Sequence, residues 1–456
     1  MPRFMIAAAH KSSGKTVVST GLAAALHARK KSVQTFKKGP DYIDPMWLRA
    51  ASRRACYNLD YNTMNDREIR DLFVRKSGGS LALIEANKGL FDGVDPSGTD
   101  SNAAMAKLLR APVILVVDTT GTTRGIAPLL LGYRAFDKDV NIAGVILNKT
   151  GGARHEGKLR AAVETYTDIP VVGAIGKTRE LDIGERHLGL TTPAETGELS
   201  AMIGNFGRIV GGAVDLDRLT DIAATAPQLP KAEPAATAAT GRRLRIGLAR
   251  DTAFGFYYDD DLEAFAANGA DLIDIDLIHD TTLPALDGLF IGGGFPETQA
   301  GALAANAVMR ANVKAAIENG LPTYAECGGL MYLCDNLVWH GQSHAMVGVI
   351  SGDAVMCSRP QGRGYARYAT QATHPWDAES TDTAAHEFHY ARIDGLSDDV
   401  TFARKILRGH GTDGQEDGVV AHNLVAGFCH LRHSEANPWV SKFVDFARSK
   451  TNSGGS

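Results

Sequence analysis

A short apolar strand that passes directly into a small-residue loop and then a helix opens the chain. Phe4–Ala9 form the predicted strand, a Gly/Ser loop follows, and the helix is expected from about Thr16 to Ala28. Backbone N–H groups at such a helix start bind phosphate oxygens, because the helix dipole is positive there and few side chains block access. A strand that feeds a helix in this way favours an α/β fold with a parallel sheet.

The loop departs from the usual phosphate-loop pattern at one position. The pattern G-x-x-x-x-G-K-[ST] ends correctly, but Ala9 stands where the first glycine belongs. The required chemistry is still present, since the small residues expose N–H groups, the lysine reaches the β- and γ-phosphates, and the threonine hydroxyl suits Mg²⁺. The sequence therefore predicts an ATP site formed by Ser12, Ser13, Gly14, Lys15 and Thr16.

Strand-length and helix-length segments alternate along the rest of the 456 residues. Predicted strands lie at 81–85, 113–118, 142–148 and 171–175 and, after a Pro/Ala/Thr-rich break, at 244–248, 288–295, 323–326 and 418–422. Because this alternation is typical of doubly wound sheets, we expect an α/β chain with two such domains. The expected division is a phosphate-loop domain 1–225, a linker 226–242, a second domain 243–448 and a disordered tail 449–456.

Composition argues against several classes of protein. The formal net charge of −4 gives no basic excess for nucleic acid, and no apolar run approaches the roughly 18 residues of a membrane span. The five cysteines form no C-x-x-C pair, so neither a zinc knuckle nor a disulfide scaffold is indicated. The N-terminus runs straight into the phosphate loop without a signal-peptide pattern, and we expect a cytoplasmic protein.

Acidic residues near the phosphate loop are candidates for metal and substrate binding. Glu85 ends an apolar strand, where an acidic Mg²⁺ partner often lies; a solvent-exposed strand end is the alternative. The rigid segment 37–45 carries Lys37, Asp41 and Asp44, which could bind metal, phosphate or a substrate carboxylate, or form an ordinary surface turn. The predicted metal ligands are Thr16, Asp41 and Glu85.

Two further polar residues follow predicted strands. Asp92 lies seven residues after Glu85, in a Gly-containing loop that could close on a ligand. Asn148 ends the strand 142–148, where an amide side chain could read the edge of adenine, although a plain strand cap is an equal alternative.

A reactive thiol is predicted in the second half. The run Tyr324–Met331 places Cys327 between a strand and two glycines, the layout of a nucleophile elbow, in which the sulfur lies exposed above a helix start. The N–H groups of Gly293 and Gly328 are candidates for an oxyanion hole. Such a thiol needs a base. His430 and His433 both qualify, the latter with Glu435 two residues on as a candidate third member.

The segment His386–Tyr390 carries two histidines and one acid at metal-like spacing. Without a third ligand the pattern is thin, and a polar wall of the substrate cleft is the favoured alternative.

These motifs together resemble the cobyrinic acid a,c-diamide synthase family, in which a dethiobiotin-synthetase-like phosphate-loop domain is fused to a flavodoxin-like class I glutamine amidotransferase domain. The resemblance extends over nearly the whole chain outside the linker and tail. It rests on the Cys327 elbow and on the segments Gly39–Pro45, Asn58–Asp60, Gly89–Gly93, Glu185–Leu190, Ile291–Glu297 and His386–Tyr390.

The resemblance implies a reaction. Glutamine is hydrolysed through a Cys327 thioester with His430 as the base, since His430 matches the family's late histidine. ATP with Mg²⁺ phosphorylates an acetate carboxylate of a tetrapyrrole, and the released ammonia displaces phosphate from the acyl phosphate. It also implies that Asp41, Ile43, Glu85 and Asp92 handle ATP, Mg²⁺ and substrate. With Lys37 and Asp44 from the rigid segment, the predicted substrate-binding residues are Lys37, Asp41, Ile43, Asp44 and Asp92.

Departures from the family lie along the expected tetrapyrrole cleft. They include Ala86-Asn87-Lys88, Leu48, Lys38 and Arg432. These departures suggest that the substrate is sirohaem, as in the branch of the family that amidates it, and not a corrin. Nickel-sirohydrochlorin is a third possible substrate. A different class, a regulatory or maturation P-loop ATPase with an inactive glutaminase half, is less favoured, since His10 stands where that class carries a second lysine. The sequence leaves a homodimer open.

Overall fold

The computed structural model describes residues 1–186, 189–190, 199–234, 241–377 and 382–453. The chain divides into two compact units, Met1–Pro234 and Ala235–Ser456, called here the first and second unit. In the described part of the chain, no helix is long and apolar enough to cross a membrane.

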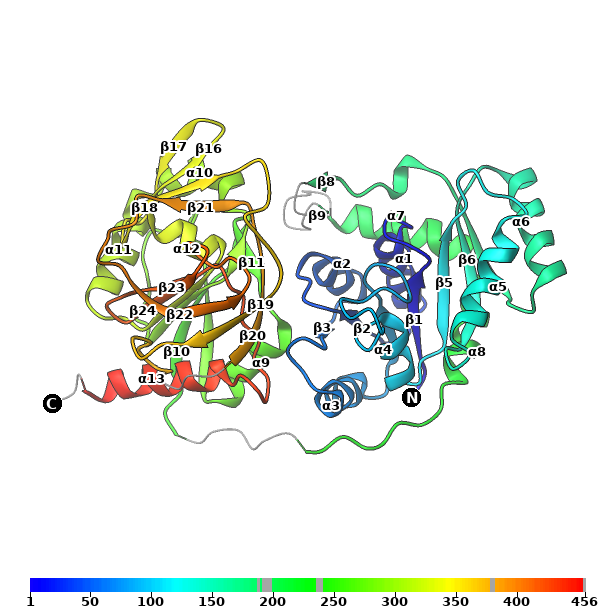
Figure 1. Ribbon diagram of the computed structural model, residues 1–456, viewed down its shortest axis with the longest axis horizontal. Coiled ribbons are helices and arrows are strands. Elements are labelled where there is room, and N and C mark those ends of the chain that lie inside the picture. The colour runs from blue at the N-terminus through cyan, green and yellow to red at the C-terminus, as the bar shows by residue number, and fades with distance from the viewer. Residues whose placement is uncertain (187–188, 191–198, 235–240, 378–381, 454–456) are drawn as a thin grey trace. The chain divides into compact units, whose positions relative to one another are not determined.

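The first unit is built on a seven-stranded sheet in which all neighbouring strands run parallel. The order β3-β2-β4-β1-β5-β6-β7 places β1 at the centre, with the chain winding outward on both sides (Figure 1). The strands are β1 (Arg3–Ala8), β2 (Val33–Lys38), β3 (Cys56–Leu59), β4 (Leu81–Glu85), β5 (Val113–Asp118), β6 (Ile142–Thr150) and β7 (Val171–Gly176).

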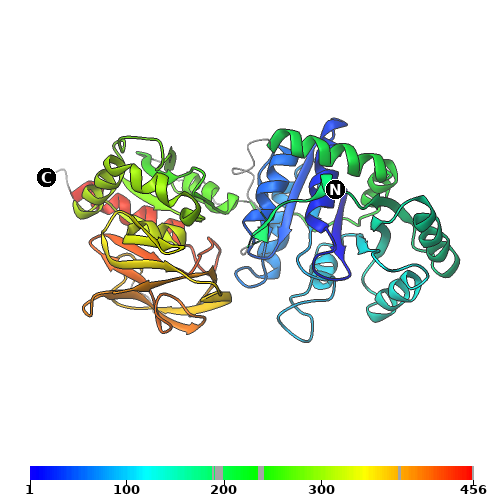
Figure 2. The ribbon, with the colours of Figure 1, turned by 90° about the horizontal axis from the view of Figure 1, so that it is seen from above.

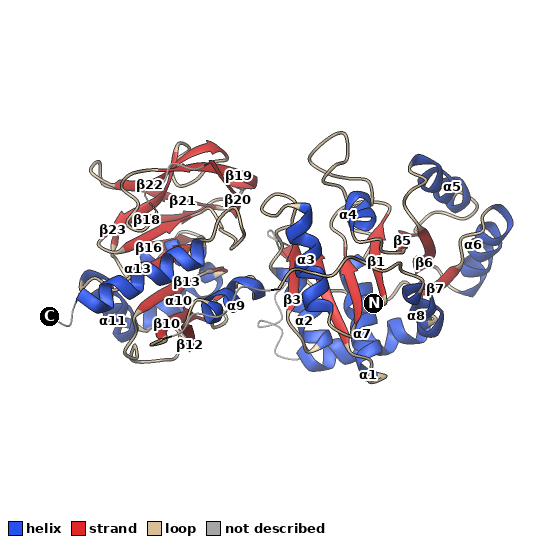
Figure 3. Ribbon diagram, turned by 90° about the horizontal axis from the view of Figure 1, so that it is seen from below, coloured by secondary structure: helices blue, strands red, loops and turns tan. Residues whose placement is uncertain are grey.

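Helices cover both faces of this sheet because successive strand side chains point to opposite sides (Figure 3). Met5 and Ala7 of β1 enter one core, whereas Phe4 and Ile6 enter the other. The helices are α1 (Lys15–Ala28), α2 (Ile43–Ser52), α3 (Asp66–Ser77), α4 (Asn102–Leu108), α5 (Ile126–Phe136), α6 (Ala153–Tyr166), α7 (Leu199–Ala213) and α8 (Leu216–Ala224). Short elements are η1 (Arg179–Leu181), β8 (Glu185–Arg186) and β9 (Gly189–Leu190).

Close packing of α7 against the middle of α1 holds the phosphate-loop helix against its neighbour. The long green helix α7 runs beside the blue α1 in Figure 2. A Cβ on Gly21 of α1 would lie 2.5 Å from Cγ2 of Val210 in α7, so only glycine allows this approach.

The second unit contains a nine-stranded sheet of mixed direction, with the order β12-β10-β13-β15-β24-β23-β22-β19-β20. The pairs from β12 to β24 are parallel and those from β24 to β20 are antiparallel. The strands are β10 (Leu244–Ala249), β12 (Ala270–Ile275), β13 (Gly288–Ile291), β15 (Thr323–Glu326), β19 (Gly362–Thr370), β20 (Asp382–His389), β22 (Thr401–Arg408), β23 (Glu416–Ala421) and β24 (Leu424–Gly427).

A smaller four-stranded sheet and several helices complete this unit (Figure 1). The sheet consists of β16 (Cys334–Trp339), β17 (Gln342–Ala345), β18 (Ile350–Met356) and β21 (Ala391–Asp394), and β11 (Phe254–Phe256) pairs with β14 (Gly293–Gly294). The helices are α9 (Asp259–Ala267), η3 (Pro296–Gln299), α10 (Ala300–Ala305), α11 (Ala307–Glu318), α12 (Gly328–Leu333) and α13 (Trp439–Ser453).

Some predicted boundaries differ from the structure. The strand expected at 288–295 is divided into β13 and β14, and the tail expected from 449 is helical to Ser453 because α13 continues. Residues 454–456 and part of the Glu185–Leu190 motif lie outside the described residues.

The first part of the expected linker, 226–234, forms no helix or strand but lies against the first unit. The buried guanidinium of Arg3 donates to the carbonyl of Pro227, and Leu229 packs on the core beside β1. Arg110 donates to the carbonyl of Gln228 at 3.2 Å.

Candidate functional site

The phosphate loop adopts a conformation that small residues favour. Ser12 and Gly14 have φ values of 67° and 85°, in the left-handed region, and α1 begins directly afterwards at Lys15. A Cβ on Gly14 would lie 2.5 Å from Nδ2 of Asn148. That amide donates to the carbonyl of Ser13 at 2.8 Å, so Asn148 supports the loop from the end of β6. Its role at adenine stays a prediction.

Thr16 reaches the last residue of β4, and Lys15 reaches the loop that follows this strand. Nζ of Lys15 donates to the carbonyl of Lys88 at 2.7 Å, and the hydroxyl of Thr16 donates to Oε1 of Glu85 at 3.0 Å. Burial, together with repulsion from Lys37, lowers the pKa of Lys15 to about 8. A bound polyphosphate would reverse this shift, because negative charge beside an ammonium favours its protonated form.

Lys37 lies at the centre of a cluster of carboxylates at the ends of β2 and β4. Its Nζ lies 2.5 Å from Oδ2 of Asp44, 2.9 Å from Oε1 of Glu85 and 3.8 Å from Oδ2 of Asp41. Burial disfavours its charge, but these three carboxylates outweigh burial and raise the pKa of Lys37 well above its ordinary value. Glu85 is fully buried, so it is not the exposed strand end that the sequence left as an alternative.

Asp41 acts on the backbone as well as on this cluster. Its Oδ1 accepts from the N–H groups of Ile43 and Asp44, at 2.9 and 3.1 Å, at the start of α2. Nδ2 of Asn58 donates to the carbonyls of Gly39 and Asp41. The segment is therefore a rigid wall beside Lys37 and not a free surface turn, while the side chain of Ile43 is buried.

Asp92 lies outside the hydrogen bonds of the Lys37 cluster. Its Oδ2 accepts from the N–H of Gly89 at 2.9 Å, which closes the loop after β4. A Cβ on Gly89 would lie 2.9 Å from the carbonyl oxygen of Ala9, so this loop packs directly on the phosphate loop. Asp92 thus shapes the loop, and contact with substrate stays a prediction.

The second unit contains a strained turn at Cys327, between β15 and α12. Cys327 has φ 48° and ψ −102°, and its N–H donates to the carbonyl of Gly427 at 2.8 Å. A Cβ on Gly329 would lie 2.3 Å from the carbonyl oxygen of Ile291, so no larger residue fits there. This is the backbone geometry of the nucleophile elbow that the sequence predicts. The predicted exposure of the sulfur is wrong, because Cys327 is buried.

The glycines predicted for an oxyanion hole lie beside this turn. A Cβ on Gly328 would lie 3.1 Å from the backbone nitrogen of Gly294, and one on Gly293 would lie 2.7 Å from Cε1 of His430. The segment 292–294, which consists of three glycines, therefore lies close to the elbow at Cys327. Whether these N–H groups bind an oxyanion stays a prediction.

His430, and not His433, is the histidine that contacts Cys327. The His430 ring is buried, hydrogen-bonds Cys327, and lies 3.3 Å through Nδ1 from Oε2 of Glu326. Burial opposes its charge, but Cys327 and Glu326 outweigh burial and raise the pKa of His430 to about 10. The backbone N–H of His433 donates instead to Asp261, and burial lowers the pKa of that imidazole.

The segment His386–Tyr390 packs around this histidine. His386 stacks on His430, and Glu387 accepts from the N–H groups of His410 and Gly411 at 2.6 and 2.8 Å. His389 stacks on Phe428 with ring centroids 3.8 Å apart. Across the described residues no group of three His, Cys, Asp or Glu side chains could hold a metal ion. The segment His386–Tyr390 therefore packs against the residues that follow β24, including His430.

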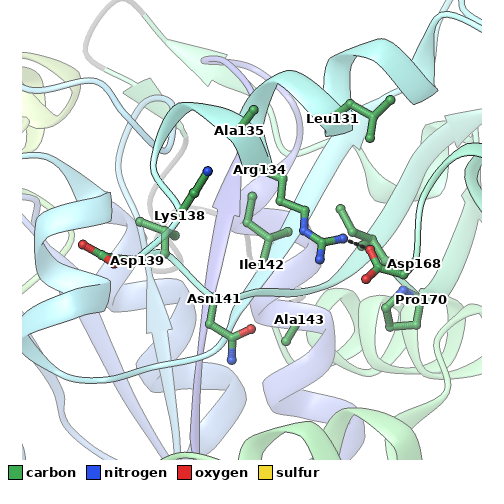
Figure 4. A pocket seen from close by; sticks show the side chains of 12 residues that line it. Leu131, Arg134, Ala135, Lys138, Asp139, Asn141, Ile142, Ala143, Asp168 and Pro170 are labelled. Atoms are coloured by element: carbon green, nitrogen blue, oxygen red, sulfur yellow. Dashed lines mark ion pairs between the residues drawn. The ribbon is translucent and has the colours of Figure 1, made fainter.

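The first unit has a hollow of about 800 Å³. It opens at the amino ends of β6 and β7, where Ile142 and Pro170 line it and Arg134 pairs with Asp168 (Figure 4). The phosphate loop contacts Asn148 at the other end of β6, so this hollow is not part of the nucleotide site.

Glu326 is the residue near the thiol that sequence reasoning missed. It precedes Cys327 directly, and its side chain is buried. The sequence could have indicated this role, because Glu326 is an acid at the end of a buried strand. Burial of an unpaired carboxylate is costly, so such a residue implies a partner.

The two halves also match known families. The CobQ/CobB/MinD/ParA nucleotide binding domain matches residues 4–190, and the CobB/CobQ-like glutamine amidotransferase domain matches residues 245–438. These matches imply a nucleotide in the first unit and glutamine in the second.

Relatives match over almost the whole chain. The chain is 42% identical to a cobyrinate a,c-diamide synthase of Magnetococcus marinus, over 99% of this chain and 98% of that protein. Proteins of the same name from Dehalococcoides mccartyi and Methanosarcina acetivorans are 39% and 38% identical, with 97% and 94% of this chain and 97% and 92% of those proteins covered. These comparisons do not support the sirohaem branch that the cleft departures suggested. The chain belongs to the cobyrinate a,c-diamide synthase family.

Proposed function

We propose that this protein converts the a and c acetate carboxylates of cobyrinate to amides, with ATP to activate each carboxylate and glutamine as the nitrogen donor. One observation carries the proposal. A buried thiol–imidazole pair and a lysine–carboxylate cluster beside a phosphate loop occur in one chain that is 42% identical, over its full length, to a protein of that name.

In the second unit, Cys327 attacks the side-chain amide of glutamine. His430, whose pKa is raised, holds the thiol proton as an imidazolium beside the Cys327 thiolate and gives it to the leaving ammonia, which leaves a glutamyl thioester. The neutral His430 then takes a proton from the water that hydrolyses the thioester, and the thiolate leaves. The carbonyl oxygen becomes negatively charged in each tetrahedral state. The N–H groups of Gly293 and Gly328 are our candidates for binding it.

In the first unit, a carboxylate must become an electrophile before ammonia can attack it. The carboxylate oxygen attacks the γ-phosphorus of ATP, and ADP leaves from an acyl phosphate. Ammonia then attacks the acyl carbon and displaces phosphate. Lys15 and Lys37 supply positive charge beside the transferring group, which stabilises its transition state.

The residues present also fit Mg²⁺. Oε2 of Glu85 is buried and accepts no hydrogen bond in the described structure, although Oε1 accepts from Thr16 and Lys37. Thr16 and Glu85 would hold the ion, with Asp41 nearby on the Lys37 cluster. Because Mg²⁺ commonly keeps water and phosphate ligands beside one or two carboxylates, two protein ligands suffice. Bound Mg²⁺ neutralises phosphate charge.

The test uses the full-length protein with cobyrinate, ATP, Mg²⁺ and glutamine labelled with ¹⁵N in its side-chain amide. Mass spectrometry should show two labelled amides per macrocycle, together with glutamate and ADP. Ammonium chloride should replace glutamine both in the parent and in Cys327→Ala. Sirohaem and nickel-sirohydrochlorin serve as competing substrates. Amidation of one of these, but not of cobyrinate, would contradict the proposal.

A further inference from the structure

The buried carboxylate of Glu326 binds the residues around the imidazole of His430 at three points. Its Oε2 lies 3.3 Å from Nδ1 of His430, and its Oε1 accepts from the N–H of Leu431 at 2.7 Å and from the hydroxyl of Tyr324 at 2.8 Å. One carboxylate therefore fixes both the ring and the following peptide of the same histidine.

The sheet explains how a residue next to the thiol reaches its base. Strands β15 and β24 run parallel and side by side, and Glu326 is paired with Gly427 in their register. His430 follows Gly427 by three residues, so the ends of both strands meet at one edge. A Cβ on Gly427 would lie 2.4 Å from Oδ2 of Asp417, so this position of β24 has no room for a side chain.

The position two residues after the base, where an orienting acid would be the simplest expectation, holds Arg432. Its guanidinium donates to Asp260 at 2.6 Å and lies over the ring of Tyr258. Arg432 therefore cannot accept a proton from Nδ1. Among the described residues, Cys327, Glu326 and the stacked ring of His386 face the His430 ring.

We propose that Glu326 is the positioning residue of the glutaminase centre, which fixes the His430 tautomer by accepting Nδ1–H and stabilises the imidazolium paired with the Cys327 thiolate. With Nδ1 engaged, Nε2 is the ring nitrogen left for the sulfur. Tyr324 in turn holds Glu326, and Arg404 donates to the Tyr324 hydroxyl at 3.3 Å. This inference rests on the proposed glutaminase activity.

The test compares the parent with Glu326→Gln and Glu326→Asp, both as full-length protein. In Glu326→Gln we expect kcat for glutamine hydrolysis to fall on the order of 100-fold with little change in KM, because an amide can present the wrong hydrogen-bonding partner to Nδ1. Ammonium-dependent amidation should continue, and Glu326→Asp should restore part of the activity.

A second readout separates positioning from a purely structural role. The pH dependence of Cys327 alkylation by iodoacetamide reports the thiolate–imidazolium pair, and its midpoint should move to higher pH in Glu326→Gln. The matched control is Asp261→Asn, which also neutralises a buried carboxylate of this unit, one that accepts from Trp439 and His433. This control should keep the parent's alkylation profile.

The inference fails if Glu326→Gln retains both the kinetics and the alkylation profile of the parent, or if Asp261→Asn shifts the profile equally. Absence of glutamine hydrolysis in the parent would instead overturn the proposed function, so the two failures are distinguishable.

Discussion

The imidazole rings of His386 and His430 stack with centroids 4.9 Å apart and planes inclined by 14°. Their backbones also pair, as an isolated antiparallel bridge. Burial, with the charges of His430 and Arg432 nearby, lowers the pKa of His386 well below its ordinary value. A neutral ring therefore lies against the protonated His430, and this arrangement limits the conformations open to the base.

Replacing His430 by alanine should remove glutamine-dependent amidation. Loss of a general base costs on the order of 10²- to 10⁴-fold in rate. Amidation with ammonium chloride should persist, because the first unit is unchanged. The matched control is His433→Ala, whose side chain does not share the hydrogen bond to Cys327. If His433→Ala is the inactive variant and His430→Ala is not, the assignment of the base is wrong.

Replacing Lys37 by methionine should abolish amidation with either nitrogen donor and lower the free energy of unfolding by about 3–5 kcal/mol. The substitution leaves the carboxylates of Asp44 and Glu85 buried without their cation, which is strongly destabilising. Urea denaturation and ammonium-dependent turnover measure the two effects. Lys38→Met is the comparison, since Nζ of Lys38 donates to the carbonyl of Asp100 and not to a carboxylate of the cluster. Ammonium-dependent turnover in Lys37→Met at the parent's rate would contradict our assignment of this cation.

Replacing Gly329 by alanine should destabilise the elbow. The new Cβ would lie 2.3 Å from the carbonyl oxygen of Ile291, and forced overpacking costs about 1–3 kcal/mol or more. Glutamine hydrolysis should be lost with it. Gly301→Ala in α10 meets nothing within 4 Å and should leave stability equal or higher. Thermal unfolding of both variants is the measurement, and equal melting temperatures would argue against a tight elbow.

The second unit should lose stability as pH falls because of His374. Burial, together with Arg404 and Lys442, lowers the pKa of this imidazole to about 3. Its Nδ1 accepts from the N–H groups of Trp376 and Asp377 at 3.3 and 3.1 Å. The unfolded state, with a histidine pKa of about 6.5, binds more protons than the folded state between about pH 6.5 and 3.

His374 should therefore cost up to about 1.4 kcal/mol per pH unit across that window. His374→Asn keeps an acceptor but does not titrate, so its free energy of unfolding should fall less steeply below pH 6.5. Urea titrations followed by tryptophan fluorescence would measure this, since Trp339, Trp376 and Trp439 lie in the second unit. Parallel pH dependences in parent and variant would show that His374 titrates normally.

The sequence predicted the phosphate loop and the elbow well because both depend on local order. A strand, small residues and a helix start are adjacent in the chain, so their chemistry can be read without knowing the sheet. Strands β2 and β3 were missed, because Lys37 and Lys38 in β2 suggested a surface loop. Their burial is explained by Asp44, seven residues after Lys37, and by Glu85 and the Asp100 carbonyl, which are distant in sequence.

The antiparallel half of the second sheet was predicted poorly for a related reason. Strands β19, β20 and β22 carry no long apolar run. Their pairing is fixed by neighbours far along the chain. Glu326 was missed because its partner His430 is 104 residues away. The choice between His430 and His433 likewise required the register of β24 against β15.

The contacts of Arg3 determine where the two halves can be separated for study. Its guanidinium also donates to the carbonyl of Leu109, at 2.6 Å, so Pro227 is tied to the amino-terminal strand through one side chain. An expression clone that stops at Thr225 would remove an acceptor from this buried cation and uncover the patch beneath Leu229. One that extends to Pro234 keeps both, and should yield the better-behaved isolated ATP-dependent half.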